Sequence, residues 1–239
     1  LNIPAVKTLY LAGMSETLAT ANDVGITTLK DPERLGLTLV LGGGEVSLLE
    51  LTSSYGVFAQ DGIRNQYRSI LKIEDPNGKI LFESQLSPTQ VLDPNIARAI
   101  NNILSDNEAK VPVYGESSTL FFGSRKVASK TGTTNDSRDA WVVGYTPSFT
   151  MGIWAGNSDN SVMQKKVAGL IVAPVWHQFM EYILSKYPAE DFTPYEPFPA
   201  PKPFLRGEWR GGEEYIVDKS TGKLATDLTP IDQQEKKVV

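Results

Sequence analysis

The chain has 239 residues, and the hydrophobic share of 41% is large enough to bury a sizeable core. The formal net charge is −5 without a basic block, so we expect no nucleic-acid partner. With no cysteine and one histidine, the chain excludes disulfides, thiolate metal sites and His-pair zinc sites.

Helical spacing of apolar residues predicts three helices in the first 60 residues. The first two are Pro4–Leu11 and Glu16–Ala21. The third, Glu45–Gln60, has apolar residues on most of its surface and is expected to be largely buried. Asp61-Gly62 ends it.

A hairpin and a capped helix follow. The strands Tyr67–Asp75 and Lys79–Glu83 flank Pro76-Asn77-Gly78, a strong hairpin turn. Asp93-Pro94 supplies an N-cap and a first-turn proline for a helix that runs to Leu104, and we expect a loop after that helix.

Three consecutive strands with short turns are predicted next, and they indicate an antiparallel sheet. The first contains Val127, Ser129 and Lys130, and the others are Ala140–Tyr145 and Phe149–Ala155. A helix over Val167–Lys186 follows, bent at Pro174.

The composition changes from Pro188 onward, where six prolines lie between Pro188 and Pro203. We therefore divide the chain into a domain over 1–187, a Pro-rich linker over 188–206 and a small extension over 207–239. In the extension, Glu214–Asp218 and Lys223–Thr226 predict a hairpin, and Gln233–Val239 is expected to be disordered.

The most informative motif is Lys130-Thr131-Gly132. Lys-Thr-Gly is one of three elements of a serine active site, together with Ser-x-x-Lys and Ser-x-Asn. Asn2 fits the last residue of a Ser-x-Asn whose serine lies before Leu1. We therefore expect the C-terminal part of a larger enzyme, cut inside its active site.

Two other candidates fail on geometric grounds. Ser69 and Lys72 form a Ser-x-x-Lys match, but it lies in a predicted strand, where positions i and i+3 face opposite sides, so Lys72 cannot activate Ser69. His177 lies in a predicted helix beside Trp176, and we expect a packed histidine rather than a member of a catalytic triad.

Residues 1 to about 187 resemble the transpeptidase domain of class A penicillin-binding proteins, a family of the serine β-lactamase and D,D-peptidase superfamily. The resemblance is carried by Leu1–Val6, Leu37–Thr52 with Tyr55, Asp61–Gly62, Lys130–Asn135, Asp139–Trp141 and Gly144. It implies an α/β (α+β) fold, a five-stranded antiparallel sheet flanked by helices, of which this N-terminally truncated chain supplies three strands. Ser129 departs from the family pattern, which often has glycine before the lysine.

The resemblance also implies a reaction: D,D-transpeptidation, the acyl-serine cross-linking of peptidoglycan stem peptides ending in D-Ala-D-Ala, with β-lactams as inhibitors. Lys130, Thr131 and Thr133 would bind the substrate carboxylate, and the Thr133 N–H would form half of an oxyanion hole. Gly132 would let the acyl chain approach the strand. Asn2 would hold the substrate amide. The implied chemistry needs no metal or cofactor.

The implied context is a bacterial cell-wall enzyme that maintains cell shape. It would lie on the extracytoplasmic face of the cytoplasmic membrane, anchored by an upstream segment. The nucleophilic serine and its lysine would belong to the missing N-terminal half of the same protein, which we expect as a partner, so the isolated chain should be inactive. A D,D-carboxypeptidase, a β-lactamase-like hydrolase and a non-catalytic cell-wall-binding module with this fold remain alternatives.

The 239-residue chain is predicted to form no covalent adduct with a labelled penicillin, because Ser69 is not a nucleophile. Peptide mass mapping after incubation checks this. A stable adduct on Ser69 would overturn both the geometric argument and the proposed alignment.

Overall fold

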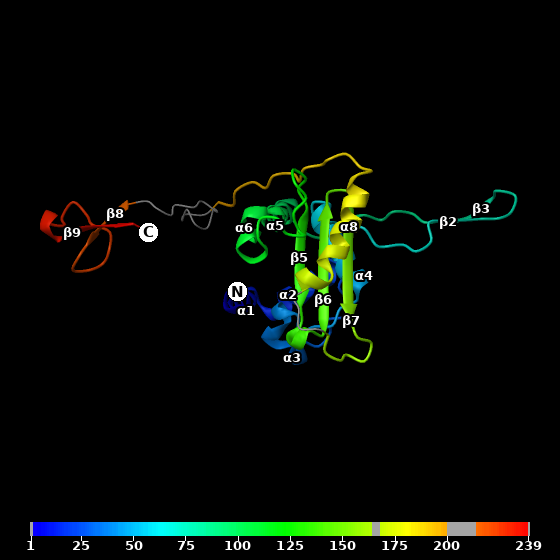
Figure 1. Cartoon of the computed structure of the whole chain (residues 1–239), viewed down its shortest axis with the longest axis horizontal. Helices are drawn as coiled ribbons and strands as arrows, with labels where there is room; N and C mark the ends of the chain where they lie inside the picture. The colour runs from blue at the N-terminus through cyan, green and yellow to red at the C-terminus, as the bar shows by residue number, and fades with distance from the viewer. Residues whose placement is uncertain (1, 164–167, 200–213, 239) are drawn as a thin grey trace. The chain divides into compact units, whose positions relative to one another are not determined.

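The computed structural model describes residues 2–163, 168–199 and 214–238 (Figure 1). The chain forms two compact units, Leu1–Tyr195 and Glu196–Val239. None of the helices in these described ranges combines the length and apolar character needed to cross a membrane.

The first unit contains all but one of the described helical segments and most of the strands. Its helices are α1 (Asn2–Ala12), α2 (Met14–Asp23), α3 (Pro32–Leu35), η1 (Gly36–Leu41), α4 (Leu48–Ala59), α5 (Pro94–Ser105), α6 (Asn107–Tyr114), η2 (Asn135–Ser137), α7 (Ala168–Ile171) and α8 (Ala173–Leu184). Its strands are β1 (Ile63–Arg64), β2 (Lys72–Glu74), β3 (Ile80–Glu83), β4 (Thr89–Gln90), β5 (Ala128–Thr133), β6 (Asp139–Thr146) and β7 (Phe149–Gly156).

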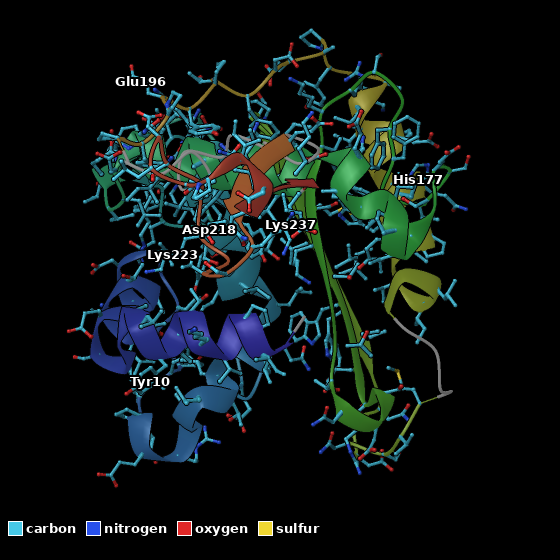
Figure 2. The ribbon with its side chains drawn as sticks, turned by 90° about the vertical axis from the view of Figure 1, so that its left-hand side faces the viewer. Tyr10, His177, Glu196, Asp218, Lys223 and Lys237 are labelled. Carbon is cyan, nitrogen blue, oxygen red and sulfur yellow. The ribbon has the colours of Figure 1, made fainter. Side chains whose placement is uncertain are left out.

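The sheet β5-β6-β7 is the centre of this unit, and both of its pairings are antiparallel. Its three strands and their order are those predicted, and the mixed fold class is confirmed. In the register, Lys130 lies opposite Val143, and Gly132 lies opposite Trp141. Figure 2 shows the sheet edge-on, with α8, marked by His177, on one side and α1, marked by Tyr10, on the other.

The face of the sheet toward α8 carries the main core. Trp176 is fully buried there, and its indole N–H donates to the Met151 carbonyl at 3.2 Å. The indole occupies the place of a side chain at position 144, because a Cβ on Gly144 would lie 2.3 Å from the Trp176 ring. Gly144 therefore lets α8 approach β6 closely. The other buried residues of this core are Leu120, Val127, Ala140, Val142, Val172, Ala173, Met180 and Leu184.

The opposite face of the sheet packs against α4 and α5. Gly152 gives α4 room, since a Cβ there would lie 2.1 Å from the Thr52 hydroxyl oxygen. Tyr145 is fully buried on this face and makes edge-to-face contacts with Tyr55 and Phe192, with ring centroids 6.0 and 5.6 Å away. These edge-to-face contacts add to the stabilisation from burial alone.

A buried polar chain joins β6 to both covering helices. The Tyr145 hydroxyl donates to Asn101 Oδ1 at 2.7 Å, and Asn101 Nδ2 donates to the Phe58 carbonyl at 2.8 Å. Asn101 is only 1% exposed. Because water cannot replace these partners, the chain of hydrogen bonds fixes α4, α5 and β6 together.

The capping residues place the helix starts. The start of α4 lies three residues after the predicted Glu45, because the Ser47 hydroxyl accepts from the Glu50 N–H at 3.1 Å and caps the helix there. Leu49 is 53% exposed, so this helix is less buried than its composition indicates. The predicted Asp93 cap of α5 is confirmed by its bond to the Asn95 N–H at 2.7 Å.

Helix α6 occupies the segment where we expected a loop. Its N-cap is Asp106, whose carboxylate accepts from the Ala109 N–H at 3.0 Å. The internal Pro112 argues against a helix in sequence-based reasoning. At this position in the short helix, its missing N–H removes only one bond, so the cap and the packing of Tyr114 outweigh the loss.

The hairpin of β2 and β3 is confirmed, but its first strand is shorter than predicted. Only Lys72–Glu74 pairs with β3, with Ile73 opposite Phe82. Ser69 lies in a bend before the strand, so the strand argument used against it was wrong in detail.

The predicted C-terminal helix is two helices, α7 and α8, with Val172 between them. Pro174 lies in the first turn of α8, where a missing N–H costs nothing. The chain therefore restarts a helix instead of bending one. The predicted start, Val167, is outside the described residues.

In the second unit, β8 (Glu214–Asp218) pairs with β9 (Gln234–Val238), after the short η4 (Ile231–Gln233). The predicted partner Lys223–Thr226 makes only one bridge, between Val217 and Leu224. The expected disorder from Gln233 was therefore wrong, because backbone pairing along the whole of β8 orders the polar strand β9.

Replacing Asn101 with alanine should lower the free energy of unfolding by about 2–4 kcal/mol, because the Tyr145 hydroxyl and the Phe58 carbonyl both lose a buried partner. Tyr145→Phe should cost about 1–2 kcal/mol, and the two effects should not add. Urea unfolding measures both. Asn102→Ala on the exposed side of α5 is the matched control, and an equal loss there would refute the buried chain.

Candidate active-site strand

Strand β5 lies at one edge of the sheet, because β6 is its only neighbour among the described strands. Side chains alternate along a strand, so Lys130 and Gly132 face the α4 side while Ser129 and Thr131 face the α8 side. The burial of Ser129 at 3% exposure and the exposure of Lys130 fit this alternation. The motif therefore has an accessible face, with Lys130 and Gly132, and a more buried face, with Ser129 and Thr131.

The Lys130 ammonium donates to the Thr131 carbonyl at 2.5 Å. In the described ranges, this lysine forms no ion pair with a carboxylate. Surrounding protein atoms desolvate the ammonium and lower the pKa of Lys130, although the residue is exposed. An exposed cation without a counter-ion is available to an anionic ligand.

Gly132 lies on the same face as Lys130 and has little around it. A Cβ at this position would meet only the Trp141 Cβ, at 3.5 Å, which is ordinary contact. Its described neighbours thus do not require glycine. The lack of a side chain instead leaves the strand surface beside Lys130 open to a ligand.

Helix α6 holds the other face of β5 through two side-chain hydrogen bonds that the sequence analysis missed. The Tyr114 hydroxyl lies 2.6 Å from the Thr131 hydroxyl, and the Lys110 ammonium donates to the Ser129 hydroxyl at 3.0 Å. The spacing of Lys110 and Tyr114 by four residues, opposite Ser129, was the available signal, but it has meaning only once residue 110 is known to be helical.

Burial lowers the pKa of Lys110 to about 8, while the nearby Asp106 carboxylate acts in the opposite direction. The ammonium has no carboxylate partner among the described ion pairs. A lysine in this setting loses part of its charge in mildly alkaline solution.

The turn after the motif is closed by Thr134 and Asp139. The Asp139 N–H donates to the Thr134 hydroxyl at 2.8 Å, and that hydroxyl donates to the Asp139 carboxylate at 3.0 Å. The Trp154 indole N–H binds the same carboxylate at 2.8 Å. Asp139 therefore fixes the turn between β5 and β6 and is not a free acid.

The structure does not place Asn2 in contact with the motif by any described interaction. Asn2 is the first residue of α1 and is exposed, and Figure 1 shows the N-terminal end of α1 on the β5 side of the sheet. Thr133 lies at the exposed end of β5. The roles expected for these two residues and for Lys130, Thr131 and Gly132 stay predictions.

The two rejected candidates lie in settings without catalytic geometry. Lys72 forms an ion pair with Glu74 in the hairpin, and Ser69 is exposed in the bend before it. His177 packs at 4.5 Å from the Phe122 ring, with one nitrogen 3.0 Å from the Thr119 carbonyl. His177 is thus a packed helical histidine, as expected.

The effect of Lys110 on stability should depend on pH. Its folded pKa of about 8 lies below the ordinary lysine value of 10.5, so the unfolded chain binds more protons between these values. Raising the pH from 8 to 10.5 should therefore stabilise the native protein relative to Lys110→Met, by on the order of 1 kcal/mol. Urea unfolding of both proteins across this range measures the difference. A pH-independent difference would contradict a buried ammonium at this site.

Comparison with known proteins places this geometry in a family. Residues 26–181 match the family described as the penicillin binding protein transpeptidase domain. Penicillin-binding protein 1A of Aquifex aeolicus is 35% identical over 193 residues, which are 80% of this chain and 26% of that protein. Penicillin-binding protein 1A of Neisseria flavescens is 31% identical over 205 residues, 82% of this chain and 24% of that protein. The chain thus spans about a quarter of the length of these relatives.

Solved structures of penicillin-binding proteins align with this chain, in agreement with the family match. The PonA1 protein of Mycobacterium tuberculosis in complex with penicillin V aligns with a TM-score of 0.63 at 25% identity, covering 75% of this chain and 52% of that one. Penicillin-binding protein 1A of Haemophilus influenzae aligns with a TM-score of 0.68 at 20% identity, over all of this chain and 38% of that one, which shows the fold. The chain belongs to the penicillin-binding protein transpeptidase family.

Proposed function

We propose that this chain forms the substrate-carboxylate side of a peptidoglycan D,D-transpeptidase site. The observation that carries the proposal is the exposed Lys130 ammonium on edge strand β5, beside the open surface at Gly132 and without an ion pair among the described residues. A stem peptide ending in D-Ala-D-Ala presents a carboxylate that such a cation attracts. Family membership supports penicillin binding and a role in peptidoglycan synthesis.

In the proposed site, the ligand lies along the open edge of β5. There the Lys130 ammonium reaches the terminal carboxylate from one face of the strand, and the Thr131 and Thr133 hydroxyls donate hydrogen bonds to it from the other. The Thr131 hydroxyl has one proton to donate. If the Tyr114 phenol donates to Thr131, that proton is free for the ligand. The Thr133 N–H and the N–H of the nucleophilic serine would stabilise the oxyanion.

The proposed reaction proceeds through an acyl-serine. The serine oxygen attacks the carbonyl of the penultimate D-Ala, the peptide C–N bond breaks, and D-Ala leaves with the proton taken from the serine. An amino group of a second stem peptide then attacks the ester carbonyl and forms the cross-linking amide. The acyl C–O bond breaks, and a proton from the amine returns to the serine oxygen. Ser69 does not fit the nucleophile, so we place the nucleophilic Ser-x-x-Lys on a segment of the protein outside these 239 residues.

The partners follow from this chemistry. β-Lactams resemble the terminal dipeptide in carrying a carboxylate near a reactive amide, and we propose that they acylate the same serine. The solved relatives include complexes with penicillin V and ampicillin. We further propose an extracytoplasmic, membrane-anchored location, because peptidoglycan is cross-linked outside the cytoplasm.

Lys130→Ala should slow acylation by a fluorescent penicillin roughly 10- to 100-fold, because one charge-assisted hydrogen bond to the ligand carboxylate is lost. The measurement is made in the natural protein that joins this chain to its serine. Lys126→Ala is the matched control, since Lys126 is exposed and only 3.9 Å from Asp191 in a surface ion pair. An unchanged rate in Lys130→Ala would remove this residue from the site.

The products distinguish the proposal from its rivals. With a stem-peptide donor and an amine acceptor, a transpeptidase forms the cross-linked peptide and releases one D-Ala per bond. A D,D-carboxypeptidase releases D-Ala without a cross-link, and a β-lactamase-like hydrolase turns over penicillin. Binding of peptidoglycan with no acylation of the natural protein would favour a non-catalytic wall-binding module.

A further inference from the structure

We propose that Tyr114 and Lys110 of α6 are positioning residues for β5. Tyr114 holds the Thr131 hydroxyl in the orientation that donates to the ligand carboxylate, and Lys110 holds the strand through the Ser129 hydroxyl. This inference rests on the proposed function, because it assigns the Thr131 hydroxyl to the carboxylate. Neither residue belongs to the Lys-Thr-Gly motif, and both act from the face of β5 opposite the Lys130 side chain.

The repeat distances of helix and strand make this arrangement possible. One helical turn separates Lys110 from Tyr114 by about 6 Å along α6. Two residues separate Ser129 from Thr131 by about 6.8 Å along β5. The two donors on α6 therefore match two successive side chains on one face of the strand, and both hydrogen bonds form at 3.0 and 2.6 Å.

We call α6, with Lys110 and Tyr114, the brace of β5. The brace is itself anchored at both ends. The Asp106 carboxylate caps the start of α6. At the other end, the Tyr114 ring packs against the main core, and a Cβ at Gly169 would lie 3.4 Å from that ring. An anchored phenol fixes the hydroxyl that it contacts, so Thr131 is not free to rotate.

Hydrogen-bonding capacity gives the direction of the bonds. An ammonium only donates, so Lys110 donates to Ser129. Tyr114 and Thr131 can each donate to the other in the free protein. A bound carboxylate accepts only, which selects the state in which Tyr114 donates to Thr131 and Thr131 donates to the ligand. Tyr114 thus contributes to ligand affinity without touching the ligand.

Tyr114→Phe removes the phenol oxygen and keeps the ring in the core. We expect it to weaken the non-covalent penicillin complex 3- to 10-fold and to leave the maximal acylation rate within twofold. Thr131→Val should have a similar effect, and the double variant should be no worse than Thr131→Val alone. Tyr187→Phe, at an exposed tyrosine, is the matched control and should match the wild type.

Lys110 is tested by a pair of variants. Lys110→Met keeps the length of the stem and loses the donor, so it should also weaken the complex, while Lys110→Arg should restore part of the affinity. Stopped-flow acylation in the natural protein separates complex formation from the chemical step. Thermal unfolding of each variant reports whether the fold itself has changed.

Effects of Tyr114→Phe and Thr131→Val that add independently, or a Tyr114→Phe affinity equal to wild type, would overturn the inference. If the wild-type protein is never acylated, the proposed function fails, and hydrogen exchange then tests the brace separately. Faster exchange of β5 amides in Tyr114→Phe, with β7 unchanged, would still support a brace on the strand, and unchanged β5 exchange would refute it.

Discussion

The antiparallel pairing of β5 with β6 is the constraint on which the site depends. It fixes which face of the sheet each β5 side chain occupies, because a shift of one residue would exchange Lys130 with Thr131. In this register Ser129 lies opposite Gly144, which admits the Trp176 ring, since a Cβ at position 144 would lie 2.3 Å from that ring. Helix α8 therefore packs closely on the face of the sheet opposite the Lys130 side chain.

The two faces of the sheet are covered in different ways. The α8 face is closed by the core around Trp176, whereas the α4 face is held by the buried hydrogen bonds from Tyr145 through Asn101 to Phe58. Beyond α4, the same face remains accessible at Lys130 and Gly132. An edge strand that is rigid on one face and open on the other suits a site that must bind a peptide along its backbone.

The structure gives a role to Ser129, the residue at which the chain departs from the pattern that the resemblance implies. The sequence analysis indicated only that Ser129 departs from that pattern. In the structure, the Ser129 hydroxyl is buried and receives the hydrogen bond of Lys110, whose pKa burial lowers to about 8. Ser129 therefore links β5 to α6 at a second point beside the contact of Tyr114 with Thr131.

Local signals in the sequence determined those elements that are bounded by capping residues, prolines or tight turns. Asp93-Pro94 set the start of α5, Pro76-Asn77-Gly78 set the hairpin, and the strand pattern leading to Lys130 predicted β5. Each depends on backbone preferences and short-range hydrogen bonds, which a sequence expresses directly.

The tertiary structure determined the elements and contacts that need a partner distant in the chain. Strand β9 looks polar and unstructured until β8 pairs with it, and α6 looks like a loop until its cap and the packing of Tyr114 compensate for Pro112. The contact between Tyr114 and Thr131 joins residues 17 positions apart. Such contacts arise from the packing of one element on another, so the spacing of Lys110 and Tyr114 has a meaning only after α6 is placed on β5.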